Sequence, residues 1–207
     1  MRHLLAIILI ALSNVVAGLA HAQFSAAQLI RDARSQIGVT TRYDASYQRL
    51  AYPNGDVAIS GGVCTDVVIR ALRKQSIDLQ RLLHEDMRAH FASYPQRWQL
   101  KRPDKNIDHR RVPNLQRYFT RQGWALKLPD SPGARTVDAF QPGDIVTWML
   151  PGNLPHIGII SDKKTFFTGT HLVLHNVGQG TQEEDALTSW PQTGHFRVQS
   201  SRDQATP

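Results

Sequence analysis

Apolar residues recur at helical spacing through the first half of the chain, every three or four positions, with polar residues between them. This spacing predicts helices over residues 23–37, 64–75, 82–94 and 114–122. Gly38 and Gly123 directly follow the first and the last of these segments, where glycine commonly ends a helix, and Pro113 suits the first turn of the last one. We therefore expect the N-terminal half to be mainly helical.

The pattern changes after residue 123, where alternating segments and short apolar runs are separated by turn residues. It predicts strands over residues 124–128, 144–150, 156–161, 171–177 and 195–198. Helices followed by antiparallel strands are typical of an α+β fold. We expect the N-terminal helices to pack on a C-terminal antiparallel sheet, with residues 78–123 as a helical and charged insertion between the second helix and the sheet.

Residues 1–22 have the pattern of a secretory signal peptide. Arg2 gives a positive start, a short apolar run follows, and Ala20-His21-Ala22 provides the small residues of a cleavage site. The apolar run is short for a membrane-spanning helix. The sequence therefore predicts a periplasmic or secreted protein with a single domain, residues 23–199, and a flexible tail, residues 200–207.

The composition and the net charge indicate which classes of partner the protein can bind. The chain is 41% hydrophobic and 20% charged, which is usual for a globular protein, and its formal charge is +7 at pH 7. A basic exported protein is attracted to anionic surfaces such as the cell wall or lipid headgroups. Export also argues against a nucleic-acid partner. We expect a monomer that has no transmembrane segment after signal cleavage and needs no cofactor.

Cys64 is the only cysteine in the chain, so an exported form has no intramolecular disulfide to make with it. The residue follows Gly61 and Gly62 at the predicted start of a helix. The free N–H groups and positive dipole end of a helix N-terminus stabilise a thiolate, and the same N–H groups can stabilise an oxyanion. Cys64 is therefore a candidate nucleophile. The alternatives are a buried side chain without chemistry, or a redox thiol, which no second cysteine supports.

A nucleophilic thiol needs a base, and His156 is the candidate. It stands at the start of an apolar strand, where Gly158 leaves space on the same face. A third polar group should orient the imidazole, and the next predicted strand offers His175 or Asn176. These two side chains point to opposite faces, so at most one can serve, and the sequence does not decide between them. A purely structural role is the alternative for either histidine.

Several other residues are candidates for binding a substrate. Arg110 and Arg111, beside His109, can hold a carboxylate through paired N–H groups. A solvated loop is the simpler interpretation of that cluster. Asp66, in the first turn of the nucleophile helix, either caps the helix or binds a substrate amine, and its charge opposes thiolate formation. Tyr43 is expected to form a wall of the core or of the cleft.

Two segments contain metal-ligand residue types, namely His84-Glu85-Asp86 and Asp104 with Asp108-His109. Neither has the paired-histidine spacing of an HExxH motif. Helix capping and surface ion pairs explain both segments more simply, so we expect no metal.

Three segments together resemble the NlpC-type cell-wall peptidases, a circularly permuted branch of the papain-like cysteine peptidases. The segments are Gly62-Val63-Cys64-Thr65-Asp66, Gln141-Pro142-Gly143-Asp144-Ile145-Val146 and His156-Ile157-Gly158-Ile159. The resemblance implies a papain-like fold and a catalytic Cys, His and polar residue in that order, with His175 the closer match to the histidine that is often third in that family. Thr65-Asp66 replaces the usual Ser-Gly pair, and the gap from Cys64 to His156 is longer than usual. Both departures leave the substrate open.

Nearly the whole mature chain is also similar to a YijF-like family of exported bacterial proteins of unknown function. The similarity is carried by Gly62-Val63-Cys64-Thr65-Asp66-Val67-Val68, His84-Glu85-Asp86-Met87, Asn106-Ile107-Asp108-His109-Arg110-Arg111-Val112-Pro113-Asn114, Gly143-Asp144-Ile145-Val146, Pro155-His156-Ile157-Gly158 and Leu174-His175-Asn176-Val177-Gly178. This family resemblance names relatives and supplies little chemistry.

Our hypothesis is an exported cysteine hydrolase that cleaves amide bonds, in peptidoglycan or peptide-like substrates. Cys64 would attack the carbonyl, His156 would act as base and then acid, and His175 or Asn176 would orient His156. Residues expected to contact the substrate are Tyr43, Asp66, His109, Arg110 and Arg111. The alternative is a non-catalytic cell-wall or ligand-binding module that keeps a peptidase-like cleft.

Overall fold

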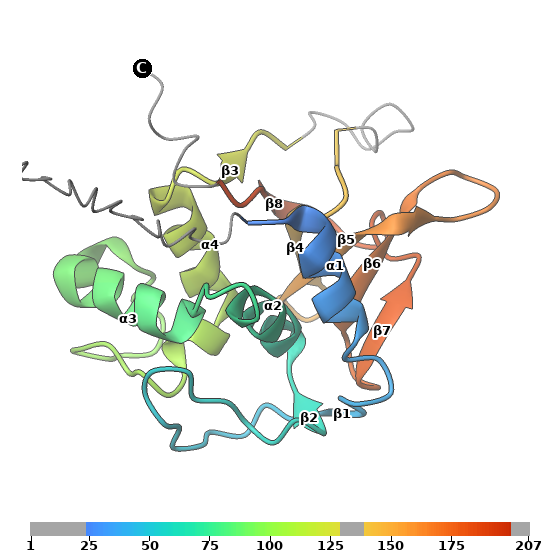
Figure 1. Cartoon of the computed structure of the whole chain (residues 1–207). Coiled ribbons are helices and arrows are strands. Elements are labelled where there is room, and N and C mark those ends of the chain that lie inside the picture. The colour runs from blue at the N-terminus through green and yellow to red at the C-terminus, as the bar shows by residue number, and fades with distance from the viewer. Residues whose placement is uncertain (1–23, 129–138, 200–207) are drawn as a thin grey trace, which may run out of the picture.

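Helices form the first part of the chain. The computed structural model describes residues 24–128 and 139–199, so the predicted signal peptide and tail lie outside the described residues (Figure 1). The helices are α1 (Ala26–Arg34), α2 (Cys64–Arg73), α3 (Leu79–His90) and α4 (Val112–Arg121), with short 3-10 turns η1 (Phe91–Ser93) and η2 (Asp108–Arg110). The helices α3 and α4 and the turns η1 and η2 make up the expected insertion between α2 and the sheet.

A six-stranded antiparallel sheet forms the second part. Its strands are β3 (Ala125–Leu126), β4 (Ile145–Leu150), β5 (Leu154–Lys164), β6 (His171–Asn176), β7 (Thr181–Glu184) and β8 (Gln192–Phe196), in the spatial order β3-β8-β4-β5-β6-β7. A separate parallel pair joins β1 (Arg42–Tyr43) to β2 (Gly61–Gly62). The predicted α+β class, with N-terminal helices and a C-terminal antiparallel sheet, is confirmed.

The sheet separates two hydrophobic clusters. The first lies between one face of the sheet and the helices that cover it (Figure 1). In this cluster Ile157 and Ile159 of β5 pack with residues of all four α-helices. The second lies on the other face and includes Trp148 of β4 and Ile160 of β5. Because successive side chains of a strand point to opposite faces, residues 156, 158 and 160 face the second cluster.

Capping explains where the helices differ from the prediction. The third helix begins at Leu79 rather than Leu82, because the Asp78 side chain accepts a hydrogen bond from the Gln80 N–H (3.2 Å) and caps it. It ends at His90, and the predicted last turn is the 3-10 turn η1. The first helix ends at Arg34, three residues early, and a turn leads on to Gly38.

Two strands differ from the prediction for opposite reasons. β5 continues past its apolar stretch to Lys164, because it pairs with β6 as far as His171. β7 was not predicted, because Thr181-Gln182-Glu183-Glu184 is polar throughout and gives no apolar alternation. Its pairing with β6 supplies the edge of the sheet.

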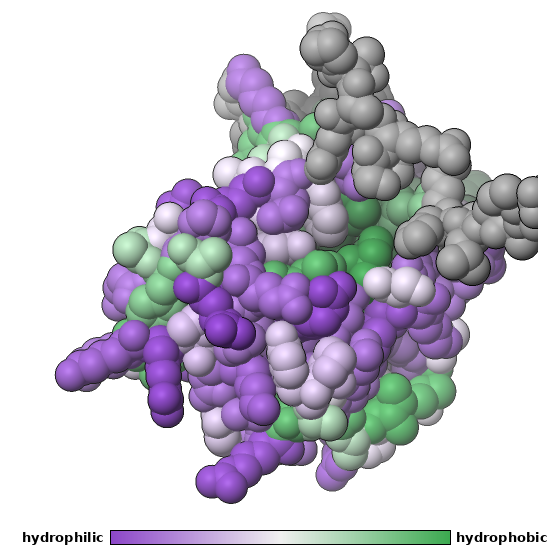
Figure 2. Space-filling view, turned by 60° about the vertical axis from the view of Figure 1, so that its left-hand side comes forward, coloured by the Kyte–Doolittle hydropathy of each residue, from purple (hydrophilic) through white to green (hydrophobic). Residues whose placement is uncertain are grey.

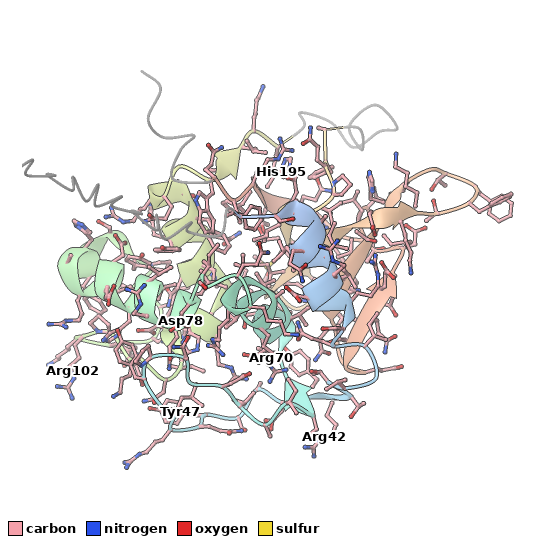
Figure 3. The ribbon with its side chains drawn as sticks, viewed as in Figure 1. Arg42, Tyr47, Arg70, Asp78, Arg102 and His195 are labelled. Carbon is pink, nitrogen blue, oxygen red and sulfur yellow. The ribbon has the colours of Figure 1, made fainter. Side chains whose placement is uncertain are left out.

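The loop before α2 is held in place by one buried arginine. Arg70 of α2 donates hydrogen bonds to both carboxylate oxygens of Asp56 (2.9 and 3.1 Å), to the Gly61 carbonyl (3.0 Å) and to the Thr40 hydroxyl (2.9 Å). Figure 3 labels Arg70 on α2, above the loop that carries Arg42. These bonds fix the chain that leads into the first residue of α2.

The face shown in Figure 2 is mostly hydrophilic, and green hydrophobic residues show in smaller patches between the purple ones. Over residues 24–128 and 139–199, no helix has the length and apolar character needed to cross a membrane.

Candidate active site

Cys64 is the first residue of α2, and its position depends on the residues around it. Gly62 has no room for a side chain, because a Cβ there would lie 2.9 Å from the Asp66 Oδ2 atom. Val63 donates its N–H to the same oxygen (2.6 Å), and Asp66 donates its own N–H back to the Val63 carbonyl (3.1 Å). Asp66 therefore caps the helix that presents Cys64.

The Cys64 thiol is buried, with 3% of the residue exposed. Burial raises the pKa of the thiol to about 12, and the negative charge of Asp66 acts in the same direction. Backbone hydrogen bonds from Ile157, Thr65 and Cys64 itself oppose this rise and lower the pKa. The thiol is therefore protonated at neutral pH in this state, and the helix N-terminus alone does not make it a thiolate.

His156 and His175 lie together and form a relay. The His156 Nε2 atom is 2.8 Å from His175 Nδ1, and His175 Nε2 is 3.1 Å from a carboxylate oxygen of Glu184 on β7. The ring of Trp190 lies against both imidazoles, at 5.8 and 6.3 Å between centroids. This arrangement can orient the His156 ring, with the half-exposed Glu184 carboxylate holding His175 in turn.

Both imidazoles are neutral at neutral pH. Burial, together with the charge of the neighbouring His175, lowers the pKa of His156 to about 3. Burial also lowers the pKa of His175, while the hydrogen bond that His175 donates to Glu184 acts in the opposite direction. A neutral imidazole can accept a proton, so His156 is in the protonation state that a base requires.

The thiol and the His156 ring approach β5 at consecutive residues. The thiol takes a hydrogen bond from the Ile157 backbone, on the helix side of the sheet, whereas the His156 ring packs against Trp148 of the second cluster (5.9 Å between centroids). No hydrogen bond joins the Cys64 sulfur to either imidazole among the described residues. The expected thiol–imidazole bond is thus missing from this state, because the strand alternation turns the ring of residue 156 away from the helices.

Asn176, the alternative third residue, has another role. Its side-chain amide donates to the Gly62 carbonyl (3.0 Å), two residues before Cys64, and to the Arg42 carbonyl (3.4 Å). The structure places His175, and not Asn176, beside His156. Asn176 instead ties β6 to the loop that enters α2.

A cleft of about 340 Å³ opens beside Cys64. It is lined by Tyr43, Ala45, Val63, Cys64, Arg97, Trp98, Ile107, Arg110, Arg111, Val112, Pro113, Asn153 and Pro155. Arg111 stacks on Trp98 at 4.1 Å from the ring centroid and pairs with Asp108 (2.8 Å). Burial, followed by the proximity of Cys64, raises the pKa of Tyr43 to about 12, so its hydroxyl stays protonated. Tyr43 and Arg111, which are expected to contact the substrate, both line this cleft with Cys64, and their role in binding stays a prediction.

Two residues expected to bind substrate are occupied inside the protein. Arg110 donates to both Asp66 oxygens (3.0 and 2.9 Å), and the two side chains are 2% and 3% exposed. Its remaining N–H groups bond the carbonyls of Asp44 (3.0 Å) and Ser46 (3.2 Å). The prediction that Asp66 and Arg110 hold substrate charges is corrected, because each already neutralises the other.

His109 is also not available to a substrate. It is 2% exposed, it does not line the cleft, and burial lowers its pKa to about 3. Its Nδ1 atom is buried without a hydrogen-bond partner among the described residues. The side chain points inward because η2 turns the chain there, which the sequence pattern could not show.

A larger hollow of about 700 Å³ lies on the same polar segment and is lined by Tyr47, His84, Arg88, Leu100, Arg102, Pro103, Asp104, Lys105 and Asn106. Figure 3 labels Tyr47 and Arg102 there. It is not lined by Cys64, whereas the smaller cleft is, so the smaller cleft is the candidate active site. Within the described ranges, no three His, Cys, Asp or Glu side chains are placed to hold a metal ion.

Sequence reasoning missed Glu184. The signal available was weak, because Gly178 and Gly180 mark a turn after the His175 strand, and a returning strand after such a turn would bring an acidic residue near His175. The role of Trp190 as a cover for the two imidazoles could not be read from sequence either, since it depends on the path of the chain between β7 and β8.

Comparisons with known proteins identify relatives. The family model described as "Domain of unknown function (DUF1287)" matches residues 30–198. The "Uncharacterized protein YijF" of Escherichia coli (strain K12) is 54% identical over 165 residues, which cover 80% of this chain and 78% of that protein. No solved structure matches. The expected YijF-like relationship is confirmed, and the resemblance to NlpC-type peptidases stays a prediction.

Proposed function

The chain belongs to the DUF1287 family, and we propose that it is an exported cysteine hydrolase that cleaves amide bonds in cell-wall peptides. The nucleophile is Cys64, the base is His156, and His175 orients that base with Glu184 behind it. Export and a peptide-like substrate are part of the proposal.

The observation that carries the proposal is that the His175–His156 pair and the Cys64 thiol both contact β5, at consecutive residues. A relay of Glu184, His175 and His156 ends at residue 156, and the next residue, Ile157, contributes the backbone hydrogen bond to the Cys64 thiol. A thiol at a helix start and an oriented, neutral imidazole are the two groups that acyl transfer by cysteine requires. Catalytic hydrogen bonds are often long or poorly aligned without substrate and tighten when it binds. Because the His156 side chain leaves β5 on the face opposite the thiol, the mechanism requires a shift of β5 at this residue on substrate binding, and not a rotation of the ring alone.

The Cys64 thiol gives its proton to His156 as the sulfur attacks the carbonyl carbon, and the carbonyl oxygen becomes an oxyanion. Backbone N–H groups at the start of α2 stabilise that charge. His156 then protonates the leaving amine, which leaves a thioester on Cys64. Water attacks the thioester with His156 as base, the acyl group leaves as a carboxylic acid, and His156 returns the proton to the Cys64 sulfur.

Charge in the cleft supports a substrate with carboxylates. Arg97 and Arg111 both line it, and Arg97 makes no ion pair with any described residue. Arg111 forms an ion pair with Asp108 and stacks on the Trp98 ring, and these two contacts fix the position of its guanidinium group. Cell-wall peptides carry free carboxylates, and guanidinium groups bind these well.

The test is hydrolysis of soluble peptidoglycan fragments, followed by mass spectrometry of the products. Wild type is expected to release new amine and acid ends, while Cys64→Ala and His156→Gln release none above background. Gln179→Ala, an exposed change on the turn after β6, serves as control and should cleave at the wild-type rate. Equal cleavage by wild type and Cys64→Ala would refute the proposal.

A second candidate, a binding module without catalysis, is favoured by one observation. The thiol has a pKa of about 12 and no hydrogen bond to an imidazole among the described residues. In that case wild type binds uncut fragments, and calorimetry gives the same affinity for wild type and Cys64→Ala with no product formed. In this case Arg111→Gln would bind the fragments more weakly than wild type, whereas Gln179→Ala would bind them as tightly as wild type.

A further inference from the structure

The hairpin of β5 and β6 carries two exposed phenylalanines at its tip. Phe166 is 93% exposed and Phe167 is 94% exposed, and their rings contact each other edge to face at 5.2 Å between centroids. Single exposed apolar residues are common on protein surfaces. Two adjacent aromatic rings in contact with water form a larger, continuous apolar patch. Figure 1 shows this hairpin projecting away from the helices and the rest of the sheet.

The tip is built without charge and with its own hydrogen bonds. Residues 165–170 are Thr, Phe, Phe, Thr, Gly and Thr. Thr165 donates its N–H to the Thr170 carbonyl (2.8 Å), the hydroxyls of Thr165 and Thr168 bond each other, and the Thr168 hydroxyl donates to that of Thr170 (2.9 Å). Because these polar groups are already bonded to one another, they lower the cost of moving the tip out of water.

The strand behind the tip is positively charged. Lys163 and Lys164 directly precede it, and both are exposed. Lys163 pairs with Glu183 (2.9 Å), and Asp162 and Glu183 both bond to Arg34 (2.5 and 2.6 Å), so two acids face the three basic side chains Arg34, Lys163 and Lys164 and the charge stays positive. Lys164 makes no ion pair among the described residues. An uncharged aromatic tip therefore lies next to a basic collar.

We propose that the 165–170 tip docks into the surface of an anionic lipid membrane. Phe166 and Phe167 enter the boundary between headgroups and acyl chains, where aromatic side chains are favoured. Lys163 and Lys164 stay at the level of the phosphates and bind their negative charge. The positive formal charge of the chain, +7, attracts it to the same surface. This docking is independent of the chemistry at Cys64 and would hold the protein beside a membrane.

The experiment is co-flotation of the purified protein with vesicles. Wild type is expected to float with vesicles of phosphatidylglycerol and phosphatidylcholine and to be released from them by high salt. Phe166→Ala/Phe167→Ala should reduce the partition constant for the vesicles by at least about tenfold, and Lys164→Gln should reduce it less. Ile59→Ala, which removes an exposed apolar side chain (52%) elsewhere, should bind as wild type does.

Three results would overturn the proposal. The first is failure of wild type to bind anionic vesicles, which would leave the tip as a contact for a protein. The second is equal binding by wild type and the double phenylalanine variant. The third is equal binding to vesicles of phosphatidylcholine alone, because the lysine collar would then contribute nothing. Cleavage of soluble peptidoglycan fragments by the double variant should be unchanged, which separates this test from the test of the proposed function.

Discussion

Replacing Arg110 by methionine should destabilise the fold strongly, although this residue lies at the edge of the candidate cleft. The change leaves the Asp66 carboxylate in a buried site, where Val63 is the remaining donor at 2.6 Å, and it leaves the carbonyls of Asp44 and Ser46 without their arginine. Removing one partner of a buried ion pair costs about 3–5 kcal/mol. For a domain of this size, 1 kcal/mol lowers Tm by about 2–4 °C, so a fall of roughly 10 °C is expected.

The assay is thermal and urea unfolding followed by circular dichroism. Arg97→Met is the matched control, because Arg97 lines the same cleft and is exposed without an ion pair among the described residues, so its change should stay within about 0.5 kcal/mol. Asp66→Asn/Arg110→Met should recover part of the loss, since no buried charge is then left unpaired. If Arg110→Met were no less stable than Arg97→Met, the reasoning that Arg110 is structural would be refuted.

Three further predictions concern titration and the relay. Because the pKa of His156 is lowered to about 3, kcat/KM for peptide cleavage should stay level from pH 8 to about pH 5; an acid limb centred near pH 6.5 would contradict this. Glu184→Gln should reduce kcat/KM about threefold and move the acid limb to lower pH, because Glu184 raises the pKa of His175; an unchanged pH profile would show that Glu184 does not act through the relay. The lowered pKa of His109 means that the unfolded chain binds a proton between pH 6.5 and about 3 and the folded chain does not. The free energy of unfolding should therefore decrease as the pH is lowered across that window. Urea unfolding should show a smaller decrease for His109→Leu than for wild type, and parallel pH dependences of the two proteins would contradict the assignment.

The sequence predicted those parts of the fold that have strong local patterns. The helix that begins at Cys64 and the strand that contains His156 both follow from apolar spacing, and both are present. β7 could not be predicted, since its residues are polar and its position depends on pairing with β6. Local pattern therefore identifies elements with a buried face and misses an edge strand.

The candidate site was predicted in its residues and only partly in its geometry. The sequence offered His175 or Asn176 as the partner of His156 and did not decide between them, and the structure has His175 beside His156. The ion pair of Asp66 with Arg110 joins residues 44 positions apart, so no local pattern could indicate that these charges neutralise each other. The missing bond from the thiol to His156 depends on which sheet face the helices cover, and strand alternation alone does not determine that.

The most direct test of the central claim is to trap an acyl group on Cys64. The protein is mixed with a peptidoglycan fragment, quenched with acid within seconds, digested and examined by mass spectrometry. The account predicts that the peptide containing Cys64 gains the mass of the acyl part of the fragment, and that His156→Gln shows no such gain. Cleavage of the fragment with no acyl group on Cys64, at a rate that Cys64→Ala matches, would contradict the account.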